Sequence, residues 1–326
     1  MLCICLQAIA QDVHYSQFNA SPLNISPGLV GAMDGDHRFM ANFRQQWRTV
    51  QVPYLQFAGG YDQKIQRKNG KTSPFSAGLQ FNYDRAGTSR LTMSSIGGMA
   101  AYRIPFGKRH DLNIGAGLTL LQRGFDNNDL IFDDQWQSYG PLTQTAQNFD
   151  NFNATFLSAS SGATVTFRAD STRSQLRVGL GGFHLNKPGK NFQDDLVRLD
   201  TRWSAYVMSV FQISQQIDAR ANVSYQSQGP HSELVASLAT AFHLDQRRAS
   251  NIAVWLGVGY RFFDQGDAIS PMVGIDYNNW RIGASYDINL SGFAEATSGR
   301  GGPELSLIYM ITNPKEEYCE MCPKYL

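Results

Sequence analysis

The chain has 326 residues, of which 42% are hydrophobic and 17% are charged, and its formal net charge is +1. This length is enough for a large core or for one large barrel, and a near-neutral charge without a basic run argues against nucleic acid as a partner. No apolar run approaches the roughly 20 residues of a spanning helix, which excludes a helical membrane protein but not a membrane β-barrel, because half of each barrel strand is polar.

The first ten residues, MLCICLQAIA, predict a secretory signal peptide. The apolar run ends in Ala8-Ile9-Ala10, and small residues at the first and third positions before the cut are what signal peptidase requires. A positively charged start is missing, and a buried N-terminal strand is the alternative. Residues 11–37 carry three Ser-Pro or Pro-Gly points and no periodicity, so we expect an extended N-terminal segment there.

From residue 38 onwards, apolar and polar residues alternate, most clearly in the stretch 279–290, NWRIGASYDINL. One face of this stretch begins with Trp280 and ends with Leu290, whereas the other carries Arg281 and Asp287. A period of two predicts a β-strand with one apolar and one polar face. Such a strand fits a soluble sandwich, and it also fits a membrane barrel with lipid outside and a water-filled lumen inside.

About fourteen strands with this pattern are predicted along the chain. They are expected near 38–47, 53–66, 73–83, 91–103, 111–124, 153–168, 174–186, 201–213, 216–226, 233–243, 250–263, 269–277, 279–290 and 303–312. Most have about 10–14 residues, which is the length of a tilted outer-membrane strand and longer than the usual sandwich strand.

The predicted connections differ in length in a regular way. Every second connection is short (KNGK, PFGKR, DST, SQ, DQRR and NN), and the others are longer on average, with about 28 residues at 125–152. Short turns on one side, longer loops on the other and an even strand count are typical of outer-membrane barrels. We therefore predict an all-β, transmembrane, antiparallel up-and-down β-barrel over 38–312, with both termini and the tail 313–326 in the periplasm.

The sequence predicts no catalytic site, cofactor or metal. G-x-S-x-G and H-E-x-x-H motifs are absent, and His184, His231 and His243 each stand alone in the sequence, so an enzyme is not expected. The longest loop contains four aspartates, Asp126, Asp129, Asp133 and Asp134. It lacks the spacing of a calcium-binding EF-hand loop, so a solvated acidic loop is favoured over a calcium site.

Charged residues of both signs are predicted on the lumen side of the barrel. These are Asp276, Arg281, Asp287 and Glu304 on three consecutive strands, with Asp218 and Arg220 on another. Such charges can pair across strands and fill the lumen, and the alternative is a docking surface for a peptide or a plug. The bulky inward residues Trp255 and Met272 also argue mildly against an open pore.

The C-terminal tail carries a C-x-x-C pair, Cys319 and Cys322. There is no second pair and no nearby histidine, so a zinc site is not expected. In an exported protein, a disulfide or a tail that contacts a partner is favoured over two idle thiols in a disordered tail.

Six segments spread over nearly the whole mature chain occur in a characteristic order. They are QDVHYSQFNASPLNISPGLVG, LIFDDQW, FHLNKPGKNF, SYQSQGPHSEL, the stretch 260–310 and the tail CEMCPK. Together they resemble the PorP/SprF family of outer-membrane proteins, which is associated with type IX secretion and gliding in Bacteroidota. The resemblance implies a non-enzymatic barrel in the outer membrane of a Gram-negative bacterium.

The resemblance also implies partners and residues that would bind them. The expected partners are outer-membrane lipid, type IX secretion components and a secreted adhesin or the C-terminal domain of another cargo. The motif residues that carry over are His14, Tyr15, Ser16, Gln17 and Phe18, then His184, Leu185, Asn186 and Pro188, and the region of Asp287. The first five, with Cys319 and Cys322, are the candidates for partner binding. A passive channel for small solutes and a soluble secreted β-protein are the alternatives.

Overall fold

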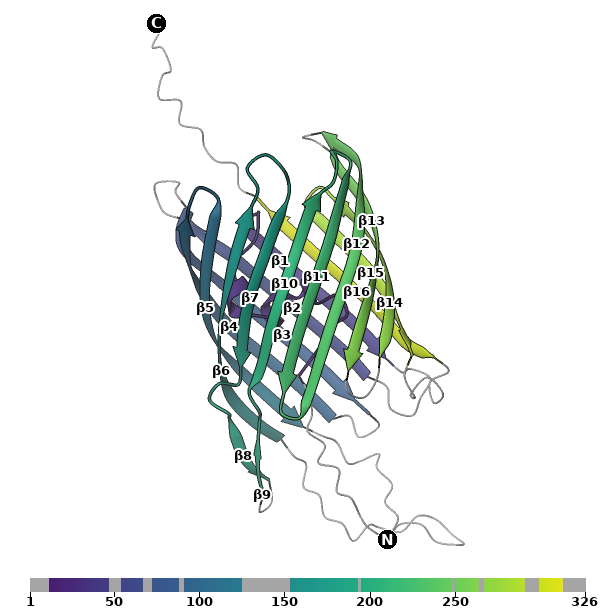
Figure 1. Cartoon of the computed structure of the whole chain (residues 1–326). Coiled ribbons are helices and arrows are strands. Elements are labelled where there is room, and N and C mark those ends of the chain that lie inside the picture. The colour runs from purple at the N-terminus through teal and green to yellow at the C-terminus, as the bar shows by residue number, and fades with distance from the viewer. Residues whose placement is uncertain are drawn as a thin grey trace, which may run out of the picture.

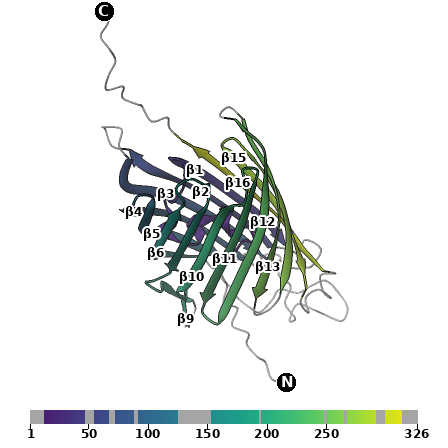
Figure 2. The same cartoon turned by 45° about the horizontal axis from the view of Figure 1, so that its top comes forward.

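The structure, a computed structural model, describes residues 12–46, 54–66, 72–87, 91–124, 153–192, 195–247, 250–263, 267–290 and 299–312. Over these residues the chain forms a closed barrel of fourteen antiparallel strands, as predicted (Figure 1). Each barrel strand pairs with the next one along the wall, and the last strand returns to pair with the first, with His37 opposite Ile311 and Arg44 opposite Glu304 (Figure 2).

The strand boundaries lie close to those predicted from the alternation. The barrel strands are β1 (His37–Gln46), β2 (Tyr54–Gln66), β3 (Thr72–Ala86), β4 (Leu91–Phe106), β5 (His110–Gly124), β6 (Asn153–Arg168), β7 (Gln175–Phe183), β10 (Arg202–Gln212), β11 (Ile217–Gln228), β12 (His231–Arg247), β13 (Ser250–Phe263), β14 (Ala268–Tyr277), β15 (Trp280–Asn289) and β16 (Arg300–Ile311). The connection between β7 and β10 contains a hairpin that its sequence did not indicate, β8 (Gly189–Phe192) with β9 (Asp195–Arg198).

The outer face of the barrel is apolar, as a lipid-facing wall requires. Leu79 and Leu180 on this face are 60% and 63% exposed. Aromatic rings lie towards both ends of the wall, with Trp280 and Tyr309 4.3 Å apart at one end and Tyr260 and Phe262 4.3 Å apart at the other. An apolar band bordered by aromatic rings is typical of outer-membrane barrels. Among the described residues, no helix has the length and apolar character needed to cross a membrane.

The connections at the two ends of the barrel differ in average length. At one end, which we call the turn end, lie the turns 107–109, 169–174, 213–216 and 278–279. At the opposite end, which we call the loop end, lie the connections 184–201 and 229–230 and the strand ends that flank residues 125–152 and 291–298. As predicted, the loop-end connections are longer on average than the turn-end ones, although the two-residue turn 229–230 is an exception.

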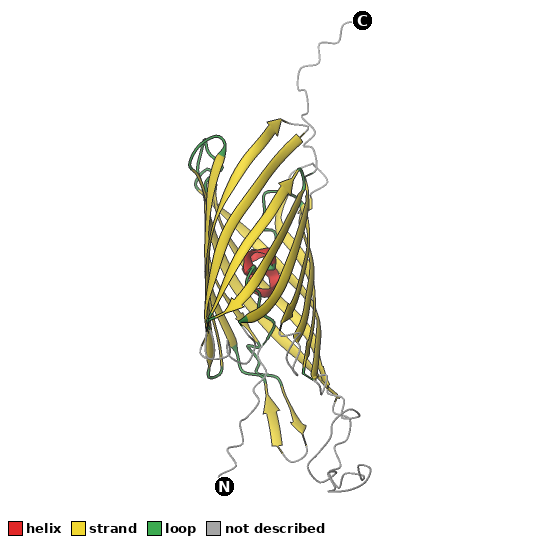
Figure 3. Cartoon of the chain, turned by 90° about the vertical axis from the view of Figure 1, so that its right-hand side faces the viewer, coloured by secondary structure: helices red, strands yellow, loops and turns green. Residues whose placement is uncertain are grey.

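Residues 12–36, which we call the plug, run through the inside of the barrel. They include three short 3-10 helices, η1 (Phe18–Ala20), η2 (Pro22–Asn24) and η3 (Pro27–Leu29), which Figure 3 shows within the wall. Proline at the first helical position favours each of the last two helices because its fixed φ suits a helix start, and the Ser26 hydroxyl accepts a hydrogen bond from Gly28 N. The predicted extended segment is thus a compact one.

The course of the plug separates the two ends of the described chain. Asp12 contacts His184 and Gln228 at the loop end, whereas Thr312 follows β16 at the turn end. We expected both ends of the mature chain on one side of the membrane, and this geometry differs from that expectation. The reason is that residues 12–36 cross the lumen before β1 begins.

The hydrophobic core of the molecule is organised around the plug. Of four buried apolar clusters among the described residues, three contain plug side chains packed against inward-facing wall residues. Phe18, Ile25 and Leu29, for example, pack with Tyr206 and Met208 of β10. The wall and the plug therefore form one core, which leaves the lumen filled at this level.

Candidate functional site

The centre of the site is a carboxylate of the wall that binds the backbone of the plug. Glu304 on β16 accepts hydrogen bonds from the backbone N–H groups of Ser16 and Gln17, each at 2.8 Å. Glu304 is fully buried. One wall residue therefore holds two consecutive peptide groups of the plug.

The Gln17 side chain is recognised at both of its polar atoms. Its amide nitrogen donates to Ser285 Oγ at 3.0 Å, and its carbonyl oxygen accepts from Ser306 Oγ at 2.7 Å. A Cβ at Gly283 would lie 2.4 Å from that oxygen, so a larger residue at this wall position would displace the Gln17 amide. The pocket is therefore shaped for an amide side chain.

A buried ionic network lies directly beside Glu304. Asp287 on β15 accepts from the Ser16 hydroxyl at 2.8 Å and pairs with Arg44 at 2.6 Å and Arg261 at 3.1 Å. Arg44 also donates to the backbone carbonyl of His14 at 2.6 Å. Arg44 and Asp287 are both fully buried. Buried charges are tolerated only when they are paired and hydrogen-bonded, and the plug supplies several of the required partners.

The plug is also held where it begins, at the loop end. Asp12 pairs with His184 Nε2 at 2.7 Å and with Arg202 Nε at 3.2 Å, and His184 Nδ1 shares a hydrogen bond of 2.8 Å with Ser158 Oγ. Carboxylate, imidazole and hydroxyl are the groups of a hydrolase triad, but Ser158 is only 2% exposed and is enclosed between wall and plug. The arrangement fixes Asp12 in place.

Two histidines that stand alone in the sequence are not isolated in the fold. His184 contacts Asp12 and Ser158, and His243 lies 2.7 Å from Asp218. Asp12 is brought to His184 from 172 positions away along the chain, so the sequence around His184 does not show this partner. Neither contact provides a free nucleophile, and the absence of catalysis stays a prediction.

Burial in the lumen changes the proton affinity of the first plug residues. It lowers the pKa of His14 to about 4 and raises the pKa of Tyr15. Burial alone would raise the pKa of Asp12, but the neighbouring His184 and Arg202 outweigh it and hold that pKa below its usual value. Asp12 is therefore ionised and His14 neutral at neutral pH.

The His14 shift predicts a loss of stability in mild acid. Between pH 6.5 and about 4 the unfolded chain binds a proton at His14 that the folded chain does not, so stability falls as the pH falls through this window. We expect a loss of about 3 kcal/mol in the free energy of unfolding between pH 7.5 and pH 4. Denaturant unfolding of the wild type and His14→Gln at both pH values measures it. An equal acid loss in both proteins would contradict it.

Glycines on the inner face of the wall make room for the second half of the plug. A Cβ at Gly115 would lie 2.1 Å from Pro27 O, one at Gly162 would lie 2.2 Å from Ser26 Oγ, and one at Gly181 would lie 2.3 Å from Ile25 O. These glycines lie on β5, β6 and β7, which are adjacent strands. Together they form a groove in which the plug backbone contacts the wall directly.

Filling this groove is expected to displace the plug. Gly115→Val should cost about 1–3 kcal/mol of stability, because a side chain there collides with the plug backbone. Gly98→Val on the neighbouring strand is the matched control, since its Cβ would find nothing nearer than Leu79 Cδ2 at 4.0 Å. Limited proteolysis of both folded variants should cut the plug faster in Gly115→Val alone. Equal cleavage would rule out the groove.

At its far end the plug is tied to β1 and β2. Gly31 N donates to Asp62 at 2.7 Å, and Asp62 pairs with Arg38 at 2.8 Å. Arg38 in turn donates to the Leu29 carbonyl at 3.0 Å. These contacts hold the chain just before it enters β1.

The predicted lumen charges fall into two separate groups. Asp287 and Glu304 bind the plug, whereas Asp276 and Arg281 pair with each other at 2.9 Å near the turn end. Asp276 also pairs with Arg220 at 2.6 Å. The structure thus brings Asp276 and Arg281 together without contact to the plug centre.

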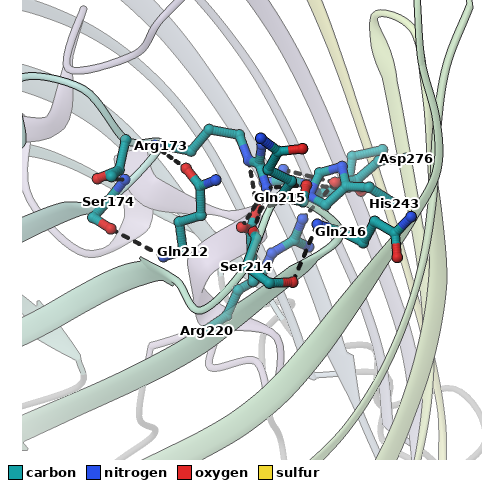
Figure 4. Close-up of polar contacts among 12 residues, drawn as sticks. Arg173, Ser174, Gln212, Ser214, Gln215, Gln216, Arg220, His243 and Asp276 are labelled. Carbon is teal, nitrogen blue, oxygen red and sulfur yellow. Dashed lines mark hydrogen bonds and ion pairs between the residues drawn. The ribbon is translucent and has the colours of Figure 1, made fainter.

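A second polar network links neighbouring turns at the turn end (Figure 4). Arg173, from the turn between β6 and β7, pairs with Asp218 at 2.9 Å and donates to the Gln215 carbonyl at 2.9 Å. His243 contacts the same aspartate at 2.7 Å. The network joins β11 and β12 to the turns 169–174 and 213–216, and it stiffens the rim of the barrel.

The FHLN motif closes the wall where β7 ends. His184 takes a left-handed φ of 55°, which ends the strand earlier than predicted, at Phe183. Beyond that point the Asn186 side chain makes the hydrogen bonds to β6 that a continued strand would make. It donates to the Leu157 carbonyl at 2.7 Å and accepts from Ala159 N at 3.0 Å. The motif residues therefore have structural roles in the wall and in holding Asp12.

The partner-binding candidates His14 to Phe18 lie in the lumen, in contact with the wall. Cys319 and Cys322, the signal peptide and the four loop aspartates Asp126, Asp129, Asp133 and Asp134 lie outside the described residues. Within the described ranges, no group of three or more His, Cys, Asp or Glu side chains could hold a metal ion.

Several residues of the site were not singled out from the sequence. They are Asp12, Arg38, Arg44, Asp62, Ser158 and Arg202. The alternation in β1 does place Arg38 and Arg44 on one face opposite Phe39 and Phe43, so their inward direction could have been read from the sequence. Their partners could not, because the partners lie in the plug or far along the chain.

Known proteins resemble this chain in sequence family and in fold. Residues 7–309 match the family described as "Type IX secretion system membrane protein PorP/SprF", and no curated protein matches the chain. The solved CymD monoaromatic hydrocarbon channel is similar at 10% identity and a TM-score of 0.49, over 90% of this chain and 93% of that one. CdiB from Acinetobacter baumannii is similar at 9% identity and a TM-score of 0.42, over 84% of this chain and 60% of that one.

Proposed function

The chain belongs to the PorP/SprF family of type IX secretion system membrane proteins, and on that basis we propose that it assists type IX secretion as a closed, non-enzymatic binding scaffold. The barrel fold and the family support an outer-membrane location. In our proposal the protein binds an exported cargo, such as a large adhesin, at the loop end and binds secretion components at the turn end.

The observation that carries the proposal of a scaffold is the filled lumen. The plug contributes to three of the four apolar clusters among the described residues, and it engages the buried charges Arg44, Asp287 and Glu304. A passive pore needs an unobstructed path, which this arrangement opposes. Binding at the rims leaves the plug in place.

Sidedness follows from the loop lengths. Outer-membrane barrels place short turns in the periplasm and longer loops outside, so we assign the loop end to the cell surface and the turn end to the periplasm. The described chain then begins at the surface side, with Asp12, and ends on the periplasmic side, with Thr312.

The surface and secreted proteome of a strain that lacks the gene tests the proposal. Loss of one or a few large adhesins would identify a dedicated partner, and loss of all type IX cargo would identify a core component. Complementation with the wild-type gene should restore the profile. An unchanged proteome would count against a role in secretion.

A further inference from the structure

We propose that the lumen is a peptide-binding site and that the plug is its separable ligand, a compact peptide recognised through a Ser-Gln pair. This goes beyond the proposed role in secretion and does not depend on it. It would make closure of the lumen a binding equilibrium instead of a fixed property of the barrel.

The barrel wall is complete without the plug. Fourteen strands close on themselves, and the plug is not a strand of that sheet. The backbone–backbone hydrogen bonds found for residues 12–34 lie within the segment, such as Ala20 N to Gln17 O at 2.9 Å. The chain first joins the backbone ladder at Asp36, whose N–H donates to Ile311 O at 2.8 Å. Removing residues 12–34 would therefore break no wall ladder among the described strands.

The wall recognises the plug in the way that a receptor recognises a peptide. Glu304 accepts hydrogen bonds from two consecutive N–H groups at 2.8 Å, and Asp287 accepts one from the Ser16 hydroxyl. Ser285 accepts a hydrogen bond from the Gln17 amide nitrogen, and Ser306 donates one to the Gln17 amide oxygen. Every one of these wall groups is a side chain. A site of this kind requires a small hydroxyl residue followed by an amide residue.

The shape of the wall adds a second, independent feature. The inner faces of β5, β6 and β7 carry glycines where a Cβ would overlap Ile25, Ser26 or Pro27 of the plug. Glycine in a strand interior weakens the strand, and it commonly marks a place where another backbone approaches closely. The ligand groove therefore extends from the Ser-Gln pocket across the lumen.

Because the plug is covalently attached to β1, its dissociation from the wall cannot be measured directly in the intact chain. A short tether gives a bound segment an effective concentration in the millimolar range, so a free peptide competes poorly with it. The tether can be cut at Asp34, whose side chain is 63% exposed at the turn end. A site for a specific protease inserted between Asp34 and Gly35 would release the segment after the barrel has folded.

The test is an exchange experiment on the folded, nicked protein in detergent, with heat-modifiable gel mobility as the check of the barrel. A fluorescent synthetic peptide of residues 12–34 should bind saturably as the resident segment leaves. Glu304→Gln replaces one of the two accepting oxygens by an N–H donor that would face a plug N–H, so it should weaken binding by roughly tenfold or more. Asp276→Asn, another inward carboxylate without plug contact, should leave the affinity unchanged.

A scrambled peptide of the same composition tests the wild-type wall without any substitution that could impair folding. It should bind at least tenfold more weakly than the native sequence. Failure of the nicked barrel to take up labelled peptide would overturn the proposal, because the segment would then be an integral part of the fold. Equal binding of the scrambled peptide would overturn it as well.

Discussion

Deletion of residues 12–33 is expected to turn a closed barrel into a conducting pore. The plug fills the lumen with Phe18, Ile25 and Leu29, and the wall behind it carries the polar groups of Arg44 and Glu304, which water would solvate. A barrel of fourteen strands lies between the filled eight-stranded barrels and the open porins of about 16–18 strands, so its empty lumen should pass ions. In planar bilayers we expect at least a tenfold rise in conductance over the wild type.

The matched control for this deletion is Cys319→Ser with Cys322→Ser, which alters the chain outside the plug and should leave the conductance at the wild-type level. Heat-modifiable mobility must show that the deletion variant is folded. A folded deletion variant that conducts no ions would mean that the wall itself closes the lumen.

Replacement of Arg44 by Met is expected to cause the largest loss of stability of any single substitution considered for this site. Arg44 lies between Asp287, at 2.6 Å, and Glu304, at 3.8 Å, and all three side chains are fully buried. Removing one partner of a buried ionic group leaves an uncompensated charge, which costs about 3–5 kcal/mol. Denaturant unfolding in lipid vesicles measures the change.

Two further variants separate charge from packing. Arg281→Met removes an inward arginine that is 35% exposed and whose partner Asp276 keeps Arg220, so it should cost no more than about 1 kcal/mol. Adding Glu304→Gln to Arg44→Met balances the buried charges again and should recover part of the loss. A double variant less stable than Arg44→Met would show that packing, and not charge, dominates.

The wall of the barrel was predictable because residues on the two faces of a strand alternate along the sequence. In the stretch 279–290 the outward Trp280 and Ile282 alternate with the inward Arg281 and Gly283, and the same period recurs in most other strands. The alternation of short turns and longer loops, together with the even number of strands, then indicated an antiparallel up-and-down barrel. These are local signals, so a single sequence contains them.

The plug was not predictable because nothing local determines it. Residues 12–36 have no periodicity, and their partners lie as far as 289 positions away, as in the contact of Gln17 with Ser306. One indirect signal was present. Gly115, Gly162 and Gly181 lie on the inward faces of three adjacent strands, where a close backbone approach is the common reason for glycine.

The β7–β10 region shows a second limit of sequence reasoning. A longer strand, 174–186, was predicted there, but β7 ends at Phe183, where His184 adopts a left-handed φ and contacts Asp12 and Ser158. Only tertiary contacts select that backbone conformation, which is uncommon for a residue other than glycine.

The measurement that tests the path of the plug most directly is the sidedness of the two ends of the chain in intact cells. One variant would carry a single cysteine on a short Gly-Ser extension ahead of Asp12, and the other would keep only Cys319, with all other cysteines replaced. A membrane-impermeant maleimide should label the first variant in intact cells and the second only after the outer membrane is permeabilised. Labelling of both ends from the same side would contradict a plug that crosses the barrel from the loop end to the turn end.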